Sequence, residues 1–407
     1  NERQKRYDDN LTKITTAIMA HELKLLYLTE LKDLRQLDKA ADKLLVSLQD
    51  WRLVFPRDPT RGNWRVMARR PEVAQAATIV MEHLQFLRDV CKAALGRHQD
   101  LDQAYTRCLT ILSKWEQLQD VSRTGYSFWF ETTPRQVTLH QTPLSVADKF
   151  GKYVADSGMA WIFTSATLAI GERFNHFTDQ LGLSEAATLC LPSPFNFAEQ
   201  ALLCVPRYLP APNQPQMVTV LADLVAEVVA HNKHGGTFVL FTSHRMLQQV
   251  ATALANRIIQ PIFVQGSSSK RELLTEFTAA GNGVLLGTSS FWEGVDVRGA
   301  ALRCVIIDKL PFASPDEPLL QARVEDCRLR GVDPFTQVQL PQAIIALKQG
   351  AGRLIRDASD QGVLIVCDHR LVTKPYGGLF LSSLPAMQRT RDLAVALDCL
   401  AQLEKPE

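Results

Sequence analysis

From residue 201 onward, short apolar runs alternate with stretches that carry the periodicity of a helix. The apolar runs lie at 237–241, 262–264, 284–286, 304–307 and 363–366. The helical stretches lie at 217–230, 245–257, 270–279, 318–330 and 336–357. A run that is apolar at every position suits a strand of a parallel sheet, because such a sheet is covered on both faces. Parallel strands need right-handed crossover connections, so the alternation predicts a three-layer α/β domain.

The amino-terminal part has a different pattern. Apolar residues recur every three or four positions over 14–48, and further helical blocks cover 72–95 and 102–118. Between the first two blocks, residues 52–70 contain proline and glycine, which predicts an irregular segment. We therefore expect residues 1–121 to form an antiparallel, all-helical domain.

The segment 52–70 is also rich in arginine. It contains Arg52, Arg57, Arg61, Arg65, Arg69 and Arg70, opposed only by Asp58. The cluster has two interpretations of equal weight: a strip that binds nucleic acid, or an exposed connector with acidic partners elsewhere. The net charge of +2 does not decide between them, because any basic surface would be local.

Residues 127–130 and 136–140 have the composition of strands, and 160–163 is a further apolar run. We expect the last of these to be a strand buried on both faces, although the preceding residues offer it no obvious neighbours. Leaving its tryptophan, isoleucine and phenylalanine in water would cost about 1.5–3 kcal/mol each. We therefore predict that this run is covered by a segment upstream of Asn1 or by a partner chain, or that it is poorly ordered.

Length and composition set the outer limits. A chain of 407 residues is long enough for two or three domains with their own cores. Its eight cysteines include no Cys-x-x-Cys pair, so we expect reduced thiols and no zinc or cluster ligation within this chain. No run approaches the eighteen apolar residues of a membrane span, and the amino terminus is polar rather than signal-like. The expected location is the cytoplasm.

Small hydroxyl residues follow three of the expected strands. They occur in Thr164-Ser-Ala-Thr-Leu168, in Phe241-Thr-Ser-His244 and at the start of residues 287–299. At the carboxyl ends of strands, such residues and their backbone amides can hold the phosphates of a sugar-phosphate backbone. For any single pair a helix N-cap is the simpler interpretation. Three pairs at three strand ends favour phosphate binding.

The segment 287–299 also carries Glu293, Gly294 and Asp296. Carboxylates at this place could orient a ribose or sense a metal-bound γ-phosphate. The alternative is that Asp296 only caps a turn.

A fourth cluster, Gln349-Gly-Ala-Gly-Arg-Leu-Ile-Arg356, places two arginines three residues apart. On a helix they would share one face, and two guanidinium forks match a triphosphate whose γ-phosphoryl group leaves. A solvated basic face is the alternative. No Gly-x-x-x-x-Gly-Lys-Ser/Thr loop and no acidic strand end of the Walker B type accompanies the pair. The chain has arginine donors without a phosphate loop.

These ordered motifs resemble those of the XPD/DinG class of superfamily 2 helicases and, within it, the bacterial YoaA branch. Residues 164–168 resemble motif III, 239–243 motif IV, 287–299 motif V and 349–356 motif VI. The family's Leu-Pro-Phe segment is present as Lys309-Leu-Pro-Phe312. The resemblance covers roughly residues 120–390.

The resemblance implies a role for each matching residue. Arg353 and Arg356 would be arginine fingers, with Gln349 nearby. The nucleotide cleft would be lined by Glu293, Gly294, Asp296 and Gly352. Phosphates of translocating single-stranded DNA would contact Thr242, Ser243, Thr288 and Ser289. The residues that couple the cleft to the DNA would be Thr164, Ser165 and Thr167.

The resemblance also implies a domain order. Residues 1–121 would be an arch-like helical domain and 122–200 the tail end of a first RecA-like domain. Residues 201–388 would be the second RecA-like domain, followed by a carboxy-terminal helix and tail at 389–407. The family's phosphate loop, its four cluster-ligating cysteines and its acidic box would lie upstream of Asn1, so the chain is expected to be part of a longer or split protein.

For the full-length parent, the resemblance implies 5′-to-3′ DNA unwinding in repair or replication, driven by ATP and Mg²⁺, with a [4Fe-4S] cluster. The chain alone is not expected to hydrolyse ATP.

The amphipathic stretch that follows residue 388 either packs on its own domain or docks a partner. Resemblance to the YoaA branch suggests the chi subunit of the replicative polymerase as that partner. The competing functions are a non-hydrolytic DNA- and partner-binding scaffold and, more weakly, a nuclease-associated module.

Overall fold

The computed structural model describes residues 35–292, 297, 299–315 and 317–403. Its contacts divide the chain into two compact units. Unit 1 comprises Asn1–Val146 and Pro318–Asp333, and unit 2 comprises Ala147–Glu317 and Pro334–Glu407. No helix in the described ranges is both long and apolar enough to cross a membrane.

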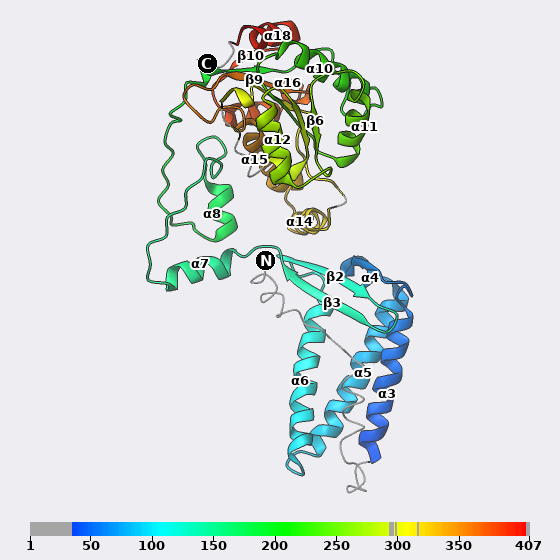
Figure 1. The fold of residues 1–407 in the computed structure, drawn as a ribbon. Helices are drawn as coiled ribbons and strands as arrows, with labels where there is room; N and C mark the ends of the chain where they lie inside the picture. The colour runs from blue at the N-terminus through cyan, green and yellow to red at the C-terminus, as the bar shows by residue number, and fades with distance from the viewer. Residues whose placement is uncertain (1–34, 293–296, 298, 316, 404–407) are drawn as a thin grey trace. The chain divides into compact units, whose positions relative to one another are not determined.

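Unit 1 is built on the long helices α3 (Arg35–Leu53), α5 (Pro71–Ala93) and α6 (Gln99–Gln119), which run side by side in Figure 1. Their apolar positions at intervals of three and four are buried against one another. Trp51 lies edge-on to Trp64 and Trp115 at the centre of this core. The expected helical blocks at 72–95 and 102–118 are confirmed, and the part of the first block before residue 35 lies outside the described residues.

The arginine-rich segment 52–70 is more ordered than expected. It contains strand β1 (Arg61–Asn63) and helix α4 (Trp64–Met67). The side chain of Arg65 is only 2% exposed and donates to the carbonyl oxygens of Val121, Arg123 and Tyr126. Arg65 is therefore a structural residue that ties α4 to residues 121–126, which follow α6, and it is not available to a nucleic acid.

The helical character expected for the amino-terminal residues is observed over 35–121, apart from the short strand β1, and unit 1 continues beyond them with a hairpin. Strands β2 (Tyr126–Thr132) and β3 (Val137–Pro143) form an antiparallel hairpin, and β1 pairs with β2. Phe128 and Phe130 alternate with polar residues and point into the helical core, because successive side chains of a strand face opposite sides. The expected strands at 127–130 and 136–140 are confirmed, but they belong with the helices and not with a parallel sheet, so this unit does not end at residue 121.

Helix α14 (Pro318–Leu329), expected within the second α/β domain, makes its contacts with β2. The Asp326 carboxylate accepts a hydrogen bond from the Gly125 amide, and Glu325 accepts one from Asn63 Nδ2 at 3.1 Å. These polar contacts explain why the helix belongs to unit 1 although it lies between two strands of unit 2 in the sequence.

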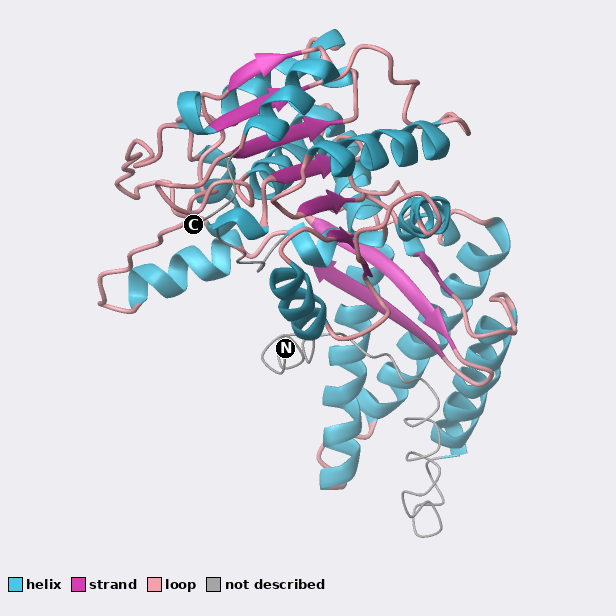
Figure 2. Ribbon diagram, turned by 45° about the horizontal axis from the view of Figure 1, so that its top comes forward, coloured by secondary structure: helices cyan, strands magenta, loops and turns pink. Residues whose placement is uncertain are grey.

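The centre of unit 2 is a seven-stranded parallel sheet, seen as a row of arrows in Figure 2. Its strands are β4 (Ala201–Cys204), β5 (Thr237–Leu240), β6 (Ile262–Val264), β7 (Val284–Gly287), β8 (Cys304–Ile307), β9 (Gly362–Val366) and β10 (Gln388–Thr390). Their order is β10-β4-β9-β8-β5-β7-β6, and every pairing is parallel. The predicted α/β fold is confirmed.

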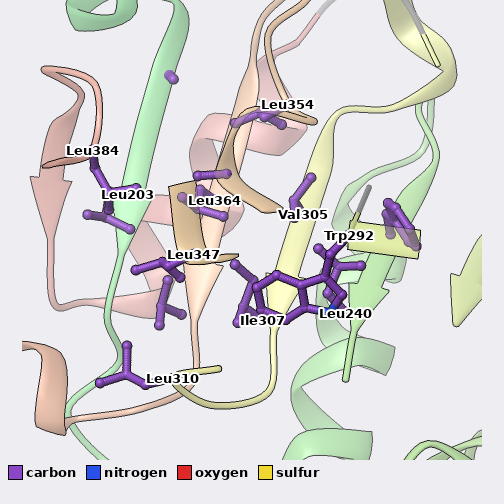
Figure 3. Packing of buried hydrophobic residues seen from close by; sticks show 14 of the residues in the cluster. Leu203, Leu240, Trp292, Val305, Ile307, Leu310, Leu347, Leu354, Leu364 and Leu384 are labelled. Atoms are coloured by element: carbon purple, nitrogen blue, oxygen red, sulfur yellow. The ribbon is translucent and has the colours of Figure 1, made fainter. Parts of the chain in front are cut away.

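Helices cover both faces of the sheet. One face packs against α10 (Met217–His231), α11 (His244–Leu254) and α18 (Leu393–Gln402). The other packs against α12 (Lys270–Ala280), α13 (Ser289–Trp292), α15 (Leu340–Ala351) and α17 (Gly377–Ser383). Figure 3 shows the second core, where Leu240, Ile307 and Leu364 from neighbouring strands meet Trp292 and Leu347. Burial on both faces explains why the strands are apolar at every position.

The expected strand at 160–163 is absent, so that prediction is wrong. The segment between α7 (Ala147–Asp156) and α8 (Asn175–Leu181) has no regular structure there, and Ile162 is 86% exposed. Trp161 contacts nearby rings such as Phe150 and Phe163, and its Nε1 donates to the Ser157 hydroxyl at 2.9 Å. A strand needs a neighbouring backbone to pair with, and no described segment of this chain pairs with residues 160–163.

The carboxy-terminal segment is part of the sheet domain. Strand β10 pairs with β4 at the sheet edge, and Leu393, Ala396 and Leu400 of α18 are buried in the core. Of the two interpretations of this helix, packing on its own domain is the one observed. Its exposed face, which includes Val395, is not used in this packing.

Candidate functional site

Two of the hydroxyl clusters come together at the carboxyl ends of β5 and β7. These strands are neighbours, and the Phe241 amide donates to the Gly287 carbonyl oxygen at 2.8 Å. Beyond this bond, His244 Nε2 lies 3.3 Å from the hydroxyl of Thr288. The structure therefore brings Thr242, Ser243 and Thr288 to one edge of the sheet.

Thr288 is buried and held by Gln265, a residue that sequence reasoning missed. Its amide and hydroxyl both donate to Gln265 Oε1, at 2.6 and 3.0 Å. Because the Thr288 hydroxyl has only one proton, it must accept from His244, so His244 Nε2 carries a proton. Gln265 Nε2 in turn donates to the Ser290 hydroxyl at 3.2 Å. The only sequence signal for Gln265 was its place just after the apolar run 262–264.

Thr242 is held by a second missed residue, Asp308, which follows β8. The Thr242 amide and hydroxyl donate to the Asp308 carboxylate at 3.1 and 3.2 Å, and the Lys309 amide donates at 2.7 Å. Burial raises the pKa of Asp308 to about 7, against the opposing effect of these hydrogen bonds. The amide and the hydroxyl of Thr242 both donate to Asp308. Thr242 therefore stabilises the loop after β5 and has no free donor for a ligand.

Ser243 caps helix α11, because its hydroxyl accepts from the Met246 amide at 3.3 Å. The simple N-cap interpretation therefore holds for this residue. Ser289 is the first residue of α13. Glu293, Gly294 and Asp296 lie outside the described residues.

The segment of Thr164, Ser165 and Thr167 forms a local turn, in which Ser165 Oγ accepts from the Thr167 amide at 3.2 Å. No hydrogen bond within the described ranges joins these three residues to the hydroxyl groups at the ends of β5 and β7. The segment instead approaches α15, where Lys348 Nζ donates to the Ala169 carbonyl oxygen at 3.3 Å. Burial lowers the pKa of Lys348.

The arginine pair does not share a helical face, so that expectation is wrong. Helix α15 ends at Ala351, and the Arg353 and Leu354 amides donate to carbonyl oxygens three residues back, which is the tighter turn of a helix end. Between the two arginines, Leu354 and Ile355 are buried in the core. The backbone therefore does not continue the helix from Arg353 to Arg356. Arg353 and Arg356 are each half-buried, and Arg353 Nε donates to the Gln349 carbonyl oxygen at 3.2 Å.

Gly350 and Gly352 allow this close packing in different ways. A Cβ at Gly350 would lie 2.9 Å from the ring of Trp292, so α13 and α15 could not approach as they do. Gly352 is the C-cap of α15, with its amide bonded to the Lys348 carbonyl oxygen at 2.9 Å. The predicted nucleotide residue Gly352 is therefore placed at the point where the chain leaves the helix toward Arg353.

The cysteines do not provide a ligand set for an iron–sulfur cluster. All eight are free thiols, and most are buried. In the portion of the chain that the structure describes, no group of three or more His, Cys, Asp or Glu side chains could hold a metal ion. The residues present do not fit the cluster that the resemblance implies for the parent.

Comparison with known proteins agrees with this architecture. The profile of the helicase C-terminal domain family matches residues 226–387. The ATP-dependent DNA helicase YoaA of Escherichia coli (strain K12) is 50% identical over 383 residues, which cover 94% of this chain and 60% of that protein. YoaA of Haemophilus influenzae is 48% identical over 388 residues, with 95% and 60% covered. The chain thus spans about 60% of the length of these relatives.

A more distant relative is the protein named 3′-5′ exonuclease DinG of Bacillus subtilis, 32% identical over 363 residues, with 82% of this chain and 38% of that protein covered. Among solved structures, an apo XPD structure aligns with a TM-score of 0.48 and 17% identity, covering 92% of this chain and 72% of that one. The resemblance inferred from the ordered motifs is confirmed. The chain therefore contains a helicase C-terminal domain and is similar to the YoaA and DinG proteins, and among these relatives it is more similar to the YoaA proteins than to DinG.

Proposed function

We propose that this chain is the carboxy-terminal part of an ATP-dependent DNA helicase that unwinds DNA in the 5′-to-3′ direction. The observation that carries the proposal is the parallel sheet of unit 2, which holds hydroxyl residues together at two adjacent strand ends. The same unit anchors an arginine pair beyond the end of α15. A helicase motor needs both a surface for DNA phosphates and cations for the nucleotide.

In this proposal Arg353 and Arg356 act as arginine fingers toward a triphosphate held with Mg²⁺ by the other lobe of the motor. Such cations stabilise the charge that develops on the transferred phosphoryl group. Gln349 supports Arg353 through its carbonyl oxygen. Gly352, together with Glu293, Gly294 and Asp296, would line the nucleotide side of the cleft.

The DNA side of the proposal rests on the ends of β5 and β7. Ser243 and Ser289 would contact phosphates of single-stranded DNA, with Thr242 and Thr288 holding their loops in place through Asp308 and Gln265. Thr164, Ser165 and Thr167 would couple this surface to the cleft, by way of the contact between Ala169 and Lys348.

We place the parent protein in the cytoplasm, in DNA repair or replication, with a [4Fe-4S] cluster carried by residues outside this chain. We expect the chain alone not to hydrolyse ATP.

Within the carboxy-terminal segment, the exposed face of α18 is the surface that would bind a partner such as the chi subunit. Val395→Lys on that face should abolish the complex while stability changes by less than about 0.5 kcal/mol. A retained complex would exclude this face.

The central test is the ATPase activity of the full-length protein with single-stranded DNA. Arg353→Ala or Arg356→Ala should lower kcat by roughly 10³-fold or more, the effect of losing an arginine finger. Arg257→Ala, an exposed arginine of the same unit paired with Asp223, is the matched control and should leave kcat unchanged. Near-normal turnover in the Arg353 and Arg356 variants would remove the finger assignment. DNA binding without any ATPase in the wild type would favour a scaffold.

A further inference from the structure

The segment that follows Arg353 and Arg356 folds around a buried carboxylate, that of Asp360. This side chain is 4% exposed and lies just before β9. Its Oδ2 accepts from the amides of Arg356 and Asp357, at 2.7 and 2.8 Å. Its Oδ1 accepts from the amide of Gly299, at 3.0 Å.

The last of these bonds joins two parts of the proposed nucleotide site. Gly299 ends the segment 287–299, and Arg356 belongs to the arginine pair, so one carboxylate bonds to both. Gly299 has φ +67°, a left-handed conformation that suits glycine, and this conformation sets the direction of its amide. A buried carboxylate that accepts three amide protons is a strong and directional anchor.

Gln200, which lies far from this turn in the sequence, also holds it. Its Nε2 lies within hydrogen-bonding distance of the carbonyl oxygens of Asp357, Ala358 and Asp360, at 3.2, 2.9 and 2.9 Å, and its two protons are shared among these three acceptors. The turn 357–360 is therefore bonded through its amides to Asp360 and through its carbonyl groups to Gln200. This leaves the backbone of Arg356 little freedom to shift unless the end of the 287–299 segment shifts with it.

We propose that Asp360 is a positioning residue that couples the end of the 287–299 segment to Arg356. The proposal rests on the function proposed above for Arg356. A change of conformation at Gly299 when nucleotide binds would be transmitted through the Asp360 carboxylate to the backbone that carries the arginine. Asp360 touches neither nucleotide nor DNA in this account, and its effect on turnover passes through Arg356.

The test is a double-mutant cycle in the full-length protein, read out as ATPase turnover with single-stranded DNA. Asp360→Asn keeps the size of the side chain but removes the charge and one acceptor. It should lower kcat by about tenfold or more while the KM for ATP and the Kd for DNA stay within about twofold. In the Arg356→Ala background, Asp360→Asn should cause no further loss, because the two residues act as one unit. Asp357→Asn, an exposed aspartate of the same turn, is the matched control.

Each outcome separates this inference from the proposed function. If Arg356→Ala keeps normal turnover, the finger assignment fails. If Arg356→Ala abolishes turnover and Asp360→Asn does not lower it, or if the two losses are additive, the coupling by Asp360 fails. If Asp360→Asn does not fold, hydrogen exchange of the wild-type protein decides: residues 297–300 and 355–358 should gain protection together when nucleotide binds, and a change in only one of them would overturn the inference.

Discussion

Two regions of unit 2, the ends of β5 and β7 and the segment 164–167, both carry serine and threonine residues, but in different surroundings. At the ends of β5 and β7, Thr242 and Thr288 are held by side chains from other strand ends, Asp308 and Gln265. In the other segment, Ser165 and Thr167 are bonded to each other, and Ser165 is exposed while Thr167 is half-buried. The first edge is preorganised because neighbouring strands of the same sheet supply its partners. The second has no neighbouring strand among the described residues, so its geometry depends on what the rest of the protein supplies.

The largest expected consequence of this difference in preorganisation is for the free energy of unfolding of unit 2. Gln265→Leu keeps the bulk of the side chain but leaves two donors of Thr288 without their acceptor, which should destabilise unit 2 by about 2–3 kcal/mol. Ser165→Ala, the matched change in the exposed segment, should cost less than about 0.5 kcal/mol. Urea denaturation of the two variants beside the wild type measures both values. Equal effects would mean that the two segments are equally preorganised.

A second effect on stability, one that depends on pH, is expected at Asp308. Its pKa in the folded protein is about 7, above the value of 3.8 for an exposed aspartate, so the folded state binds the proton more tightly than the unfolded state. The stability that this group contributes is therefore fully present below about pH 4 and is lost as the pH rises to about 7. The difference should be on the order of a few kcal/mol.

Asp308→Asn removes this titration. The stability of the wild type relative to the variant should therefore fall between pH 4 and pH 7, and urea denaturation at several pH values would show it. A constant difference over that range would mean that the carboxylate is charged throughout, and that its hydrogen bonds with Thr242 and Lys309 outweigh its burial.

The same comparison explains how much could be predicted from sequence. Apolar runs such as 304–307 and 363–366 form strands as predicted, because they pair with each other and helices pack on both faces of their sheet. The run 160–163 is also apolar at every position but pairs with no described strand, and composition alone does not reveal a pairing partner. Gln265 and Asp308 lie 23 and 66 residues from the threonines that they hold, so no local pattern reveals them.

The end of α15 was missed for a related reason. The spacing of Arg353 and Arg356 suits a helix, and local spacing was the only guide to their arrangement. The helix instead ends where Trp292 packs on Gly350 and where Leu354 and Ile355 turn into the core. Residues distant in the sequence decide this ending. The chemistry of the arginine pair could thus be predicted, but not its geometry.

The smallest effect on stability, but a direct test of the unpaired segment, is expected at Trp161. Four of the six tryptophans, Trp51, Trp64, Trp115 and Trp292, are buried, and Trp161 is 38% exposed. Iodide should therefore quench Trp161 in the isolated chain, and Trp161→Phe should remove most of the quenchable emission without lowering stability. Trp129→Phe is the matched control, because Trp129 is half-buried and stacked on His140 at 3.7 Å, and should remove less.

In the full-length protein, the same indole should be protected if an upstream segment pairs with residues 160–163. Burial of its ring, of Ile162 and of Phe163 would then contribute about 1.5–3 kcal/mol each, which the isolated chain lacks. Equal quenching of the isolated chain and the full-length protein would mean that this segment stays uncovered in both. The coupling role proposed for Thr164, Ser165 and Thr167 would then lose its support, since these residues need a fixed neighbour to transmit a change between cleft and DNA.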